Sequence, residues 1–285
     1  MHIAFGIPPV YIGIVVALIA GLIFMGGVRR IAAFTEKIVP MMAIFYIIGS
    51  LIIIIGNISY IPEVFRQIVV GAFAPQAVVG GALGITVQKA MRYGVARGLF
   101  SNEAGMGSTP HAHALAKVPH PCQQGYVAMV GVFIDTFIIL TLTALVILCT
   151  SQGDIETFSL TGAALAAACF SARSGIVGKW FIGVSMVVFA FATVIAWYYL
   201  GQQAVVYLKE KTGILHLHIF YPILFLLAVF AGGCIRLEAI WMLSDLWNGL
   251  MAFFNLTALL FLSGEVCIPD HSDLFNTTKK TPHVK

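Results

Sequence analysis

The chain has 285 residues, of which 60% are hydrophobic and 10% are charged, and its formal net charge is +4. Soluble domains carry about 25% charged residues, so this composition excludes a protein with a fully water-exposed surface. Its Lys and Arg residues lie between apolar runs and form no basic face with interleaved aromatic residues, which argues against a nucleic-acid-binding protein. We therefore expect an all-α integral membrane protein.

Seven apolar runs approach or exceed the ~20 residues that a helix needs to cross the hydrocarbon core. They predict one transmembrane domain over residues 1–265, with spans at 9–27, 38–57, 68–90, 125–150, 179–207, 218–233 and 237–263. The first run has no basic segment before it and is followed by Arg29 and Arg30, so a removable signal peptide is not expected. Residues 266–285 are polar and are expected to form a cytoplasmic tail.

The third predicted span is interrupted by four glycines, by a proline and by a polar residue: Gly71, Gly80, Gly81, Gly84, Pro75 and Gln76. Gly costs about 1 kcal/mol and Pro about 3 kcal/mol in a helix interior, so the sequence predicts a break. An unwound backbone persists in lipid only where protein, water or a ligand satisfies its polar groups, as in the midplane sites of many secondary transporters. The alternative is a glycine-rich surface for close helix packing.

A shorter apolar run lies between Thr157 and Phe170. It is too short to cross the bilayer, and Asp154 and Glu156 before it suit the start of a helix. We expect a short helix that lies across the outer face.

Basic residues are distributed unequally between the two sides that these spans define. If the N-terminus is outside, twelve of the 16 basic residues are on the inner side and four are on the outer side. The inner ones are Arg29, Arg30, Lys37, Lys89, Arg92, Arg97, Lys117, Lys209, Lys211, Lys279, Lys280 and Lys285, and the outer ones are Arg66, Arg173, Lys179 and Arg236. The positive-inside rule thus predicts a multi-pass protein of the inner (plasma) membrane, with the N-terminus outside and the C-terminus cytoplasmic.

The most distinctive stretch is RGLFSNEAGMGSTP, from Arg97 to Pro110. Its glycines supply positive φ, Ser101 and Asn102 can cap a helix, and Glu103 can pair with Arg97, so we expect a tightly folded loop. Together with GVFIDT at residues 131–136 and WYY at 197–199, this stretch resembles the alanine or glycine:cation symporters, the sodium:alanine symporter family. The similarity runs from about residue 7 to about residue 262.

The resemblance implies a leucine-transporter-like fold, in which two five-helix repeats of inverted topology enclose the substrate and the ion. The seven spans would be the fourth to tenth helices, together with the short outer-face helix. The first three helices would then be absent, and a missing N-terminal fragment would be a partner. We do not expect such a truncated chain to transport alone, and a truncated gene, a misplaced start and a split protein all stay open.

The resemblance also implies a substrate and its site. The substrate would be a small neutral amino acid such as alanine or glycine, held by Thr193 and Trp197 and by the backbone at Gly80, Gly81 and Gly84. Thr193 and Trp197 are four residues apart and so share a helical face. The alternative for the aromatic residues 197–199 is a belt at the membrane interface, and we expect the belt for Tyr198 and Tyr199.

The family's ion site would draw on Phe189, Ala192 and Thr193 through carbonyls and a hydroxyl, because hard cations prefer oxygen ligands. Ala192 stands where a hydroxyl residue is expected, so protons are kept as the alternative coupling ion to sodium. No other cofactor and no structural metal site is implied. His111 and His113 are too isolated for a metal site and are expected in a solvated inner loop.

Asp135 and Asp245 lie inside predicted spans, where a carboxylate costs about 2.5 to 3.5 kcal/mol on insertion scales. Asp135 could serve as a gating partner or a proton relay, or both carboxylates could brace helices through hydrogen bonds. We expect Arg97, Ser101, Asn102, Glu103 and Asp135 to form a gating or structural motif.

Two other functions are compatible with the sequence. An inactive truncated chain or a non-catalytic membrane subunit is the main alternative to a carrier. An intramembrane hydrolase that uses Ser101 or Asp135 is less favoured, because no His lies inside a predicted span to activate a nucleophile. We therefore do not expect an enzyme.

Overall fold

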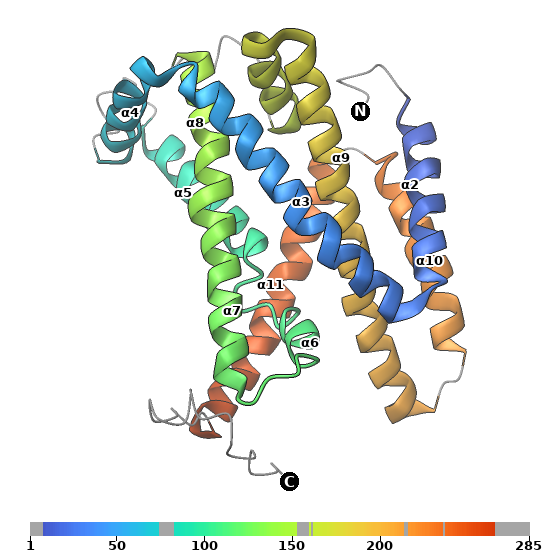
Figure 1. Cartoon of the computed structure of the whole chain (residues 1–285). Helices are drawn as coiled ribbons and strands as arrows, with labels where there is room; N and C mark the ends of the chain where they lie inside the picture. Colours follow the sequence, from blue (N-terminus) through green and yellow to red (C-terminus); the bar gives the residue numbers. More distant parts are fainter. Residues whose placement is uncertain are drawn as a thin grey trace. The chain divides into compact units, whose positions relative to one another are not determined.

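The computed structural model describes residues 8–73, 83–152, 160, 162–213, 216–235 and 237–265, which contain helices and turns but no β-strand. The longer helices are α2 (Pro9–Phe24), α3 (Gly27–Ile55), α4 (Ile61–Phe73), α5 (Leu83–Ser101), α7 (Pro121–Phe133), α8 (Thr141–Ser151), α9 (Gly162–Thr212), α10 (Leu217–Gly232) and α11 (Leu237–Leu262) (Figure 1). Shorter segments are α6 (Pro110–His113), the 3₁₀ turns Ile58–Tyr60 and Ser263–Glu265, and the π-helix Ile134–Leu140.

Four helices of the described part have the length and hydropathy to cross a membrane: Arg30–Ile55, Pro121–Ser151, Gly162–Thr212 and Leu237–Leu262. Two shorter apolar helices, Val10–Phe24 and His218–Gly232, coincide with two further predicted spans. The third predicted span falls partly outside the described residues.

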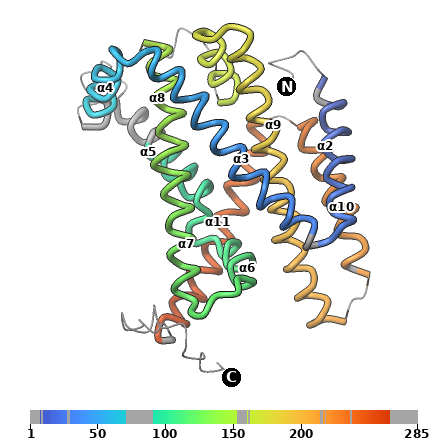
Figure 2. Tube along the Cα trace, viewed as in Figure 1, coloured from blue at the N-terminus to red at the C-terminus, as the bar shows by residue number. Residues whose placement is uncertain are grey.

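The described helices belong to two compact units. Unit 1 comprises residues 1–90 and 138–237, and unit 2 comprises residues 91–137 and 238–285. The chain passes between the units inside α5, inside the π-helix and at the start of α11. Figure 2 colours the trace by residue number, so each crossing can be followed along the chain.

Unit 1 has two clusters of buried side chains that pack its helices together. In the first cluster, α3 and α8 pack on α9 through residues such as Tyr46, Val146 and Phe170, and the Tyr46 hydroxyl hydrogen-bonds Thr143 at 2.7 Å. In the second, α2 and α10 pack on the later part of α9, where the Phe24 ring stacks on Tyr198 at 3.6 Å.

α9 contains a sharp reversal at Gly175, whose φ of 57° and ψ of −134° suit only glycine. The helical segment before the reversal begins at Gly162 and packs closely on the segment after it, because Gly178 has no side chain. A Cβ at Gly178 would lie 2.0 Å from the carbonyl oxygen of Phe170. The short helix expected between 157 and 170 corresponds to this first segment, which starts later and continues to Ser174.

Two helices are longer than the hydropathy pattern predicts. α3 begins at Gly27 instead of residue 38 and continues through Pro40, and α5 ends at Ser101 instead of residue 90. Both extensions carry charged residues, among them Lys37 and Arg97, so they add little to a hydropathy signal although their backbone remains helical. Pro40 removes one backbone hydrogen bond without ending the helix.

α7 and α8 form one continuous rod through the π-helix Ile134–Leu140. A π-helix places one additional residue in the turn, and such insertions occur frequently at functional sites. Asp135 and Thr136 lie in this wide turn.

Candidate functional site

Four of the residues predicted to hold substrate or ion lie on α9 in unit 1. Thr193 is exposed, Phe189 and Trp197 are partly buried, and Ala192 is buried. The Thr193 hydroxyl donates a hydrogen bond to the Phe189 carbonyl oxygen at 2.9 Å. This contact brings two hard oxygen atoms together on one exposed strip of the helix, whereas the Ala192 methyl supplies no oxygen.

The glycines predicted to bind substrate fall at the edge of the described chain. Gly80 and Gly81 lie outside the described residues, and Gly84 is in the first turn of α5. The predicted break at this position stays a prediction.

The prediction of an interfacial belt at Tyr198 and Tyr199 is wrong. Both side chains are buried, with relative exposures of 2% and 8%, in the cluster that packs α9 on α2 and α10. The Tyr221 ring lies beside Tyr198, and the Tyr221 hydroxyl donates to the Tyr198 carbonyl at 3.1 Å. Aromatic residues at one end of an apolar run suggest a belt, but here the rings interlock three helices.

In unit 2, the stretch from Arg97 to Pro110 folds as the end of α5 followed by a compact turn. The predicted pairing of Glu103 with Arg97 is wrong, because the Glu103 carboxylate accepts hydrogen bonds from Ser108 at 2.5 Å and Thr109 at 3.0 Å. Glu103 itself has a φ of 49°, which is rare for a residue with a side chain. These two hydrogen bonds close the strained turn on its C-terminal side, whereas the predicted partner Arg97 lies before it.

Two glycines in the same turn allow α11 to approach it closely. Gly105 and Gly107 have φ values of 74° and 78°. The Asn255 amide donates to the Gly105 carbonyl at 2.9 Å, and a Cβ at Gly107 would lie 2.6 Å from the Asn255 Oδ1 atom. The Asn255 side-chain amide therefore holds the turn on α11: it hydrogen-bonds the Gly105 backbone and occupies the space that a side chain at Gly107 would take.

The end of α5 is also joined to the π-helix by two side-chain hydrogen bonds. The Ser101 hydroxyl donates to the Asp135 carboxylate at 2.5 Å, and the Thr136 hydroxyl donates to the side-chain Oδ1 atom of Asn102 at 3.0 Å. Two neighbouring residues on one helix thus pair with two neighbouring residues in the wide turn of the other. Asp135 acts here as a hydrogen-bonding brace, which is one of the roles left open by the sequence.

Arg97 forms an ion pair with Asp245 that the sequence analysis missed. The guanidinium contacts both carboxylate oxygens, at 2.8 and 3.2 Å, and lies over the Trp241 ring at 3.7 Å from its centroid. The Phe100 ring meets Trp241 edge to face. The sequence did contain an indication of this pair, because a carboxylate such as Asp245 within an apolar helix requires a cationic partner.

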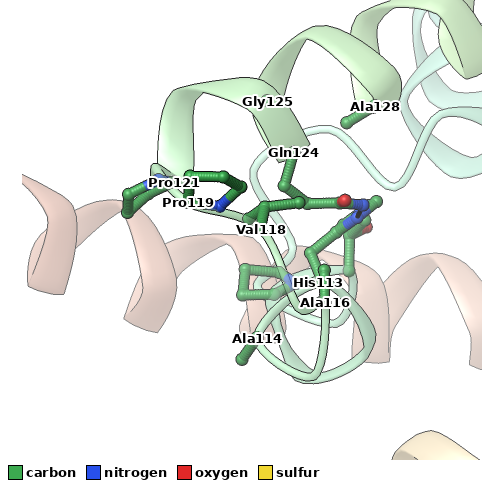
Figure 3. A pocket seen from close by; sticks show the side chains of 11 residues that line it. His113, Ala114, Ala116, Val118, Pro119, Pro121, Gln124, Gly125 and Ala128 are labelled. Atoms are coloured by element: carbon green, nitrogen blue, oxygen red, sulfur yellow. Dashed lines mark hydrogen bonds between the residues drawn. The ribbon is translucent and has the colours of Figure 1, made fainter. Parts of the chain in front are cut away.

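The two histidines predicted in an inner loop lie on the short helix α6. His113 contacts Gln124, as Figure 3 shows, and within the described residues no group of three His, Cys, Asp or Glu side chains could hold a metal ion.

Comparison with known proteins identifies the family. The sodium:alanine symporter family matches residues 1–283. The chain belongs to this family. An uncharacterized transporter of Haemophilus influenzae is 41% identical over 98% of the chain, and the sodium/alanine symporter AgcS of Methanococcus maripaludis is 39% identical over 97%. A sodium/proton-dependent alanine carrier protein of Bacillus sp. (strain PS3) is 37% identical over 91%.

The chain spans about 60% of the length of these curated relatives, with 60%, 59% and 60% of the three proteins covered. Membership of the family, together with several long apolar helices, makes this sodium:alanine symporter homologue a multi-pass membrane protein. The family is one of transporters.

Proposed function

We propose that the chain takes part in sodium-coupled symport of a small neutral amino acid such as alanine or glycine. The observation that carries this proposal is the family match over residues 1–283. The names of two relatives, a sodium/alanine symporter and a sodium/proton-dependent alanine carrier, support the substrate class and leave protons as the alternative coupling ion.

We assign the ion to the strip of α9 that carries Phe189 and Thr193. A cation with oxygen ligands at about 2.4 Å can contact two oxygens that are about 3 Å apart, because two such bonds then meet at an angle near 80°. The 2.9 Å separation of the Thr193 hydroxyl and the Phe189 carbonyl supports this assignment. Ala192 can contribute only backbone atoms.

We assign the substrate to the neighbouring turn of the same face, at Trp197, and, as the resemblance implies, to the backbone at Gly80, Gly81 and Gly84. An indole ring restricts the volume available to a side chain, which favours alanine-sized substrates. A backbone freed from helical hydrogen bonds at the glycines would bind the carboxylate and the ammonium group of the amino acid.

The topology proposed from the basic residues places the N-terminus outside and the tail in the cytoplasm. The seven spans, the leucine-transporter-like repeat arrangement and the partnership with further helices belong to the same proposal. They rest on the resemblance and on the charge asymmetry.

The ion site predicts a specific loss in a Thr193→Ala variant. In proteoliposomes that contain the chain together with the remaining helices of a relative, a sodium gradient is expected to drive labelled-alanine uptake. Thr193→Ala should raise the sodium concentration for half-maximal uptake at least tenfold, because one oxygen ligand is removed. Thr193→Ser should retain the response.

Thr257 provides a matched control for this test. Its hydroxyl makes the same backbone contact, to the Phe253 carbonyl at 2.7 Å, on α11. Thr257→Ala should leave the sodium dependence unchanged. Equal sodium responses in Thr193→Ala and wild type would overturn the ion assignment, and sodium-independent uptake by the wild type would overturn the proposed coupling.

A further inference from the structure

A cavity of about 210 Å³ lies within unit 1, between the C-terminal part of α9 and the first turns of α10. Drug-sized ligands occupy pockets of roughly 300 to 1,000 Å³, so an occupant of this cavity has few heavy atoms. None of the described residues proposed to bind the transported amino acid or the ion lines it. Its lining consists of Gln202, Val205, Val206, Lys209 and Glu210 from α9 and of His218 and Tyr221 from α10.

The cavity contains a buried hydrogen-bond acceptor that has no donor. The Gln202 Oε1 atom is shielded from solvent, and it accepts no hydrogen bond within the described part of the chain. Buried polar atoms in folded proteins are nearly always paired, so an exception requires an explanation, of which a bound molecule is one. The molecule that this oxygen selects is a donor, because a second acceptor at the same place would be repelled.

A second oxygen acceptor lies beside Gln202. The Tyr221 hydroxyl donates its proton to the Tyr198 carbonyl at 3.1 Å, so its lone pairs remain available to accept a hydrogen bond. Gly201 gives this hydroxyl room against α9, because a Cβ at Gly201 would lie 2.1 Å from the hydroxyl oxygen. Gln202 and Tyr221 both line the cavity, which therefore offers two oxygen acceptors from two helices.

Charged side chains of both signs line the same cavity. Lys209 and Glu210 are consecutive on α9, and consecutive helical residues point about 100° apart and do not face each other. Within the residues that the structure describes, neither side chain forms a hydrogen bond or an ion pair. His218 adds a ring N–H from α10. Both charges are therefore available to a ligand that carries a positive and a negative group.

We propose that this cavity binds a small neutral amino acid as a zwitterion, at a second site on α9. The ammonium group donates to Gln202 Oε1 and to the Tyr221 hydroxyl, and Glu210 balances its charge. The carboxylate accepts hydrogen bonds from Lys209 and from the His218 ring. The small volume restricts the ligand to a short side chain.

The position of the cavity on α9 indicates what the second site does. Gln202 follows Trp197 by five residues, which is about 7.5 Å further along the helix axis. The proposed topology places this end of α9 on the inner side of the membrane. An amino acid in the cavity is therefore between the proposed transport site and the cytoplasm, on the side of release. The substrate class rests on the proposed function, whereas the cavity does not depend on the residues assigned to transport.

Sodium-free binding of L-alanine tests the second site directly. Saturation-transfer NMR would measure dissociation constants for the full chain in phosphatidylcholine nanodiscs, with potassium in place of sodium and with empty nanodiscs as the blank. We expect saturable alanine binding. Propionate lacks the ammonium group and ethylamine lacks the carboxylate, so each is expected to bind about tenfold more weakly. No saturable alanine binding, or equal binding of all three compounds, would overturn the proposal.

Substitutions locate the binding within the chain. Gln202→Leu removes the buried acceptor without a large change in volume, so it should weaken alanine binding about tenfold and leave Tm unchanged or higher. Gln203→Leu, at the next position and outside the lining, is the matched control and should bind as the wild type does. Lys209→Met should weaken alanine binding but not ethylamine binding. Equal alanine binding in Gln202→Leu and Gln203→Leu, or equal losses of alanine and ethylamine in Lys209→Met, would overturn the proposal.

Trp197→Ala separates this site from the proposed function. That variant should lower sodium-driven uptake and should leave sodium-free binding unchanged. Loss of sodium-free binding in Trp197→Ala, with retention in Gln202→Leu, would place the alanine at the transport site and would overturn the second site alone. Binding that depends on Gln202, in a protein whose uptake does not respond to sodium, would support the second site and overturn the proposed coupling alone.

Discussion

The turn after α5 depends on residues that can adopt positive φ. A left-handed backbone costs an ordinary residue about 1 to 2 kcal/mol, and Glu103 offsets this cost with two hydrogen bonds from Ser108 and Thr109. Gly107 has a φ of 78° and no room for a side chain beside Asn255. The turn therefore tolerates a side chain at Glu103 but not at Gly107.

We expect Gly107→Ala to destabilise the protein by more than the ~1 to 2 kcal/mol of backbone strain alone, because the new methyl displaces Asn255. Thermal unfolding of the detergent-solubilised protein, followed by intrinsic fluorescence, would measure the fall in Tm. Gly98→Ala is the matched control, since Gly98 lies inside α5 with open space around it. That variant should be neutral or more stable by up to ~1 kcal/mol. A Gly107→Ala variant as stable as Gly98→Ala would contradict the described turn.

The Arg97–Asp245 pair is expected to show energetic coupling. Both side chains are about one-third exposed, at 31% and 39%, so the pair is neither fully buried nor freely solvated. Arg97→Gln and Asp245→Asn should each lower the free energy of unfolding, and the double variant should lose less than the sum of the two. A double-mutant cycle should give a coupling of roughly 0.5 to 3 kcal/mol.

Arg92→Gln, an exposed basic residue on the same helix, should have little effect and provides the control. A coupling of zero between Arg97 and Asp245 would indicate that the ion pair does not form in the membrane.

Single residues also show where sequence reasoning was sufficient. Glycines and short polar side chains predicted a tightly folded loop from Arg97 to Pro110, because their conformational preferences are local. The compact turn forms only after Ser101, since residues 97–101 continue α5. The partner of Arg97 could not be chosen in this way, since Glu103 is six residues away and Asp245 is 148 residues away. Only the tertiary arrangement of unit 2 decides between the two carboxylates.

At the level of elements, α9 is built around a reversal that glycine makes possible. The carbonyl of Phe170 occupies the position that a side chain at Gly178 would take. We expect Gly178→Ala to separate the two segments of α9 and to destabilise the protein by about 1 to 3 kcal/mol, as overpacking usually does. Gly249→Ala, at an open position in α11, should not. Tm values of the two variants would measure this, and a neutral Gly178→Ala would show that the contact is not maintained.

The helices illustrate what hydropathy can and cannot predict. The pattern correctly indicated long apolar helices, because even exposed side chains on these helices, such as Leu18 and Phe261, are apolar. It began α3 too late, after Lys37, and ended α5 too early, before Arg92 and Arg97, since charged residues lower hydropathy without breaking a helix. It assigned Tyr198 to an interface, because hydropathy contains no information on which rings stack.

On the scale of the whole molecule, the proposed topology places two native cysteines on opposite sides of the membrane. Cys122 precedes the fourth predicted span, on the inner side, and Cys234 precedes the last one, on the outer side. Cys234 is exposed and Cys122 is partly buried, whereas Cys149 and Cys169 are buried.

In right-side-out vesicles, a membrane-impermeant maleimide is expected to label Cys234 and to reach Cys122 only after permeabilisation. Mass spectrometry of a Cys267→Ser background would assign the labelled positions, and Cys234→Ser should remove labelling of intact vesicles. Labelling of Cys122 in intact vesicles, with Cys234 protected, would invert the topology. Labelling of both in intact vesicles would contradict the span count between them.

The π-helix has a consequence for the register of the rod in which it lies. Each residue advances an α-helix by about 100° around its axis, so the surplus residue between Ile134 and Leu140 sets the angular phase of everything after it. That phase directs Leu145, Val146 and Cys149 into the interior of unit 1. Deleting one residue from this segment would rotate those three side chains out of their packing, while Asp135 and Ser101 would keep their pairing. The π-helix thus adjusts the helical phase, so that one continuous helix can pair with α5 through Asp135 and pack in unit 1 through Leu145, Val146 and Cys149.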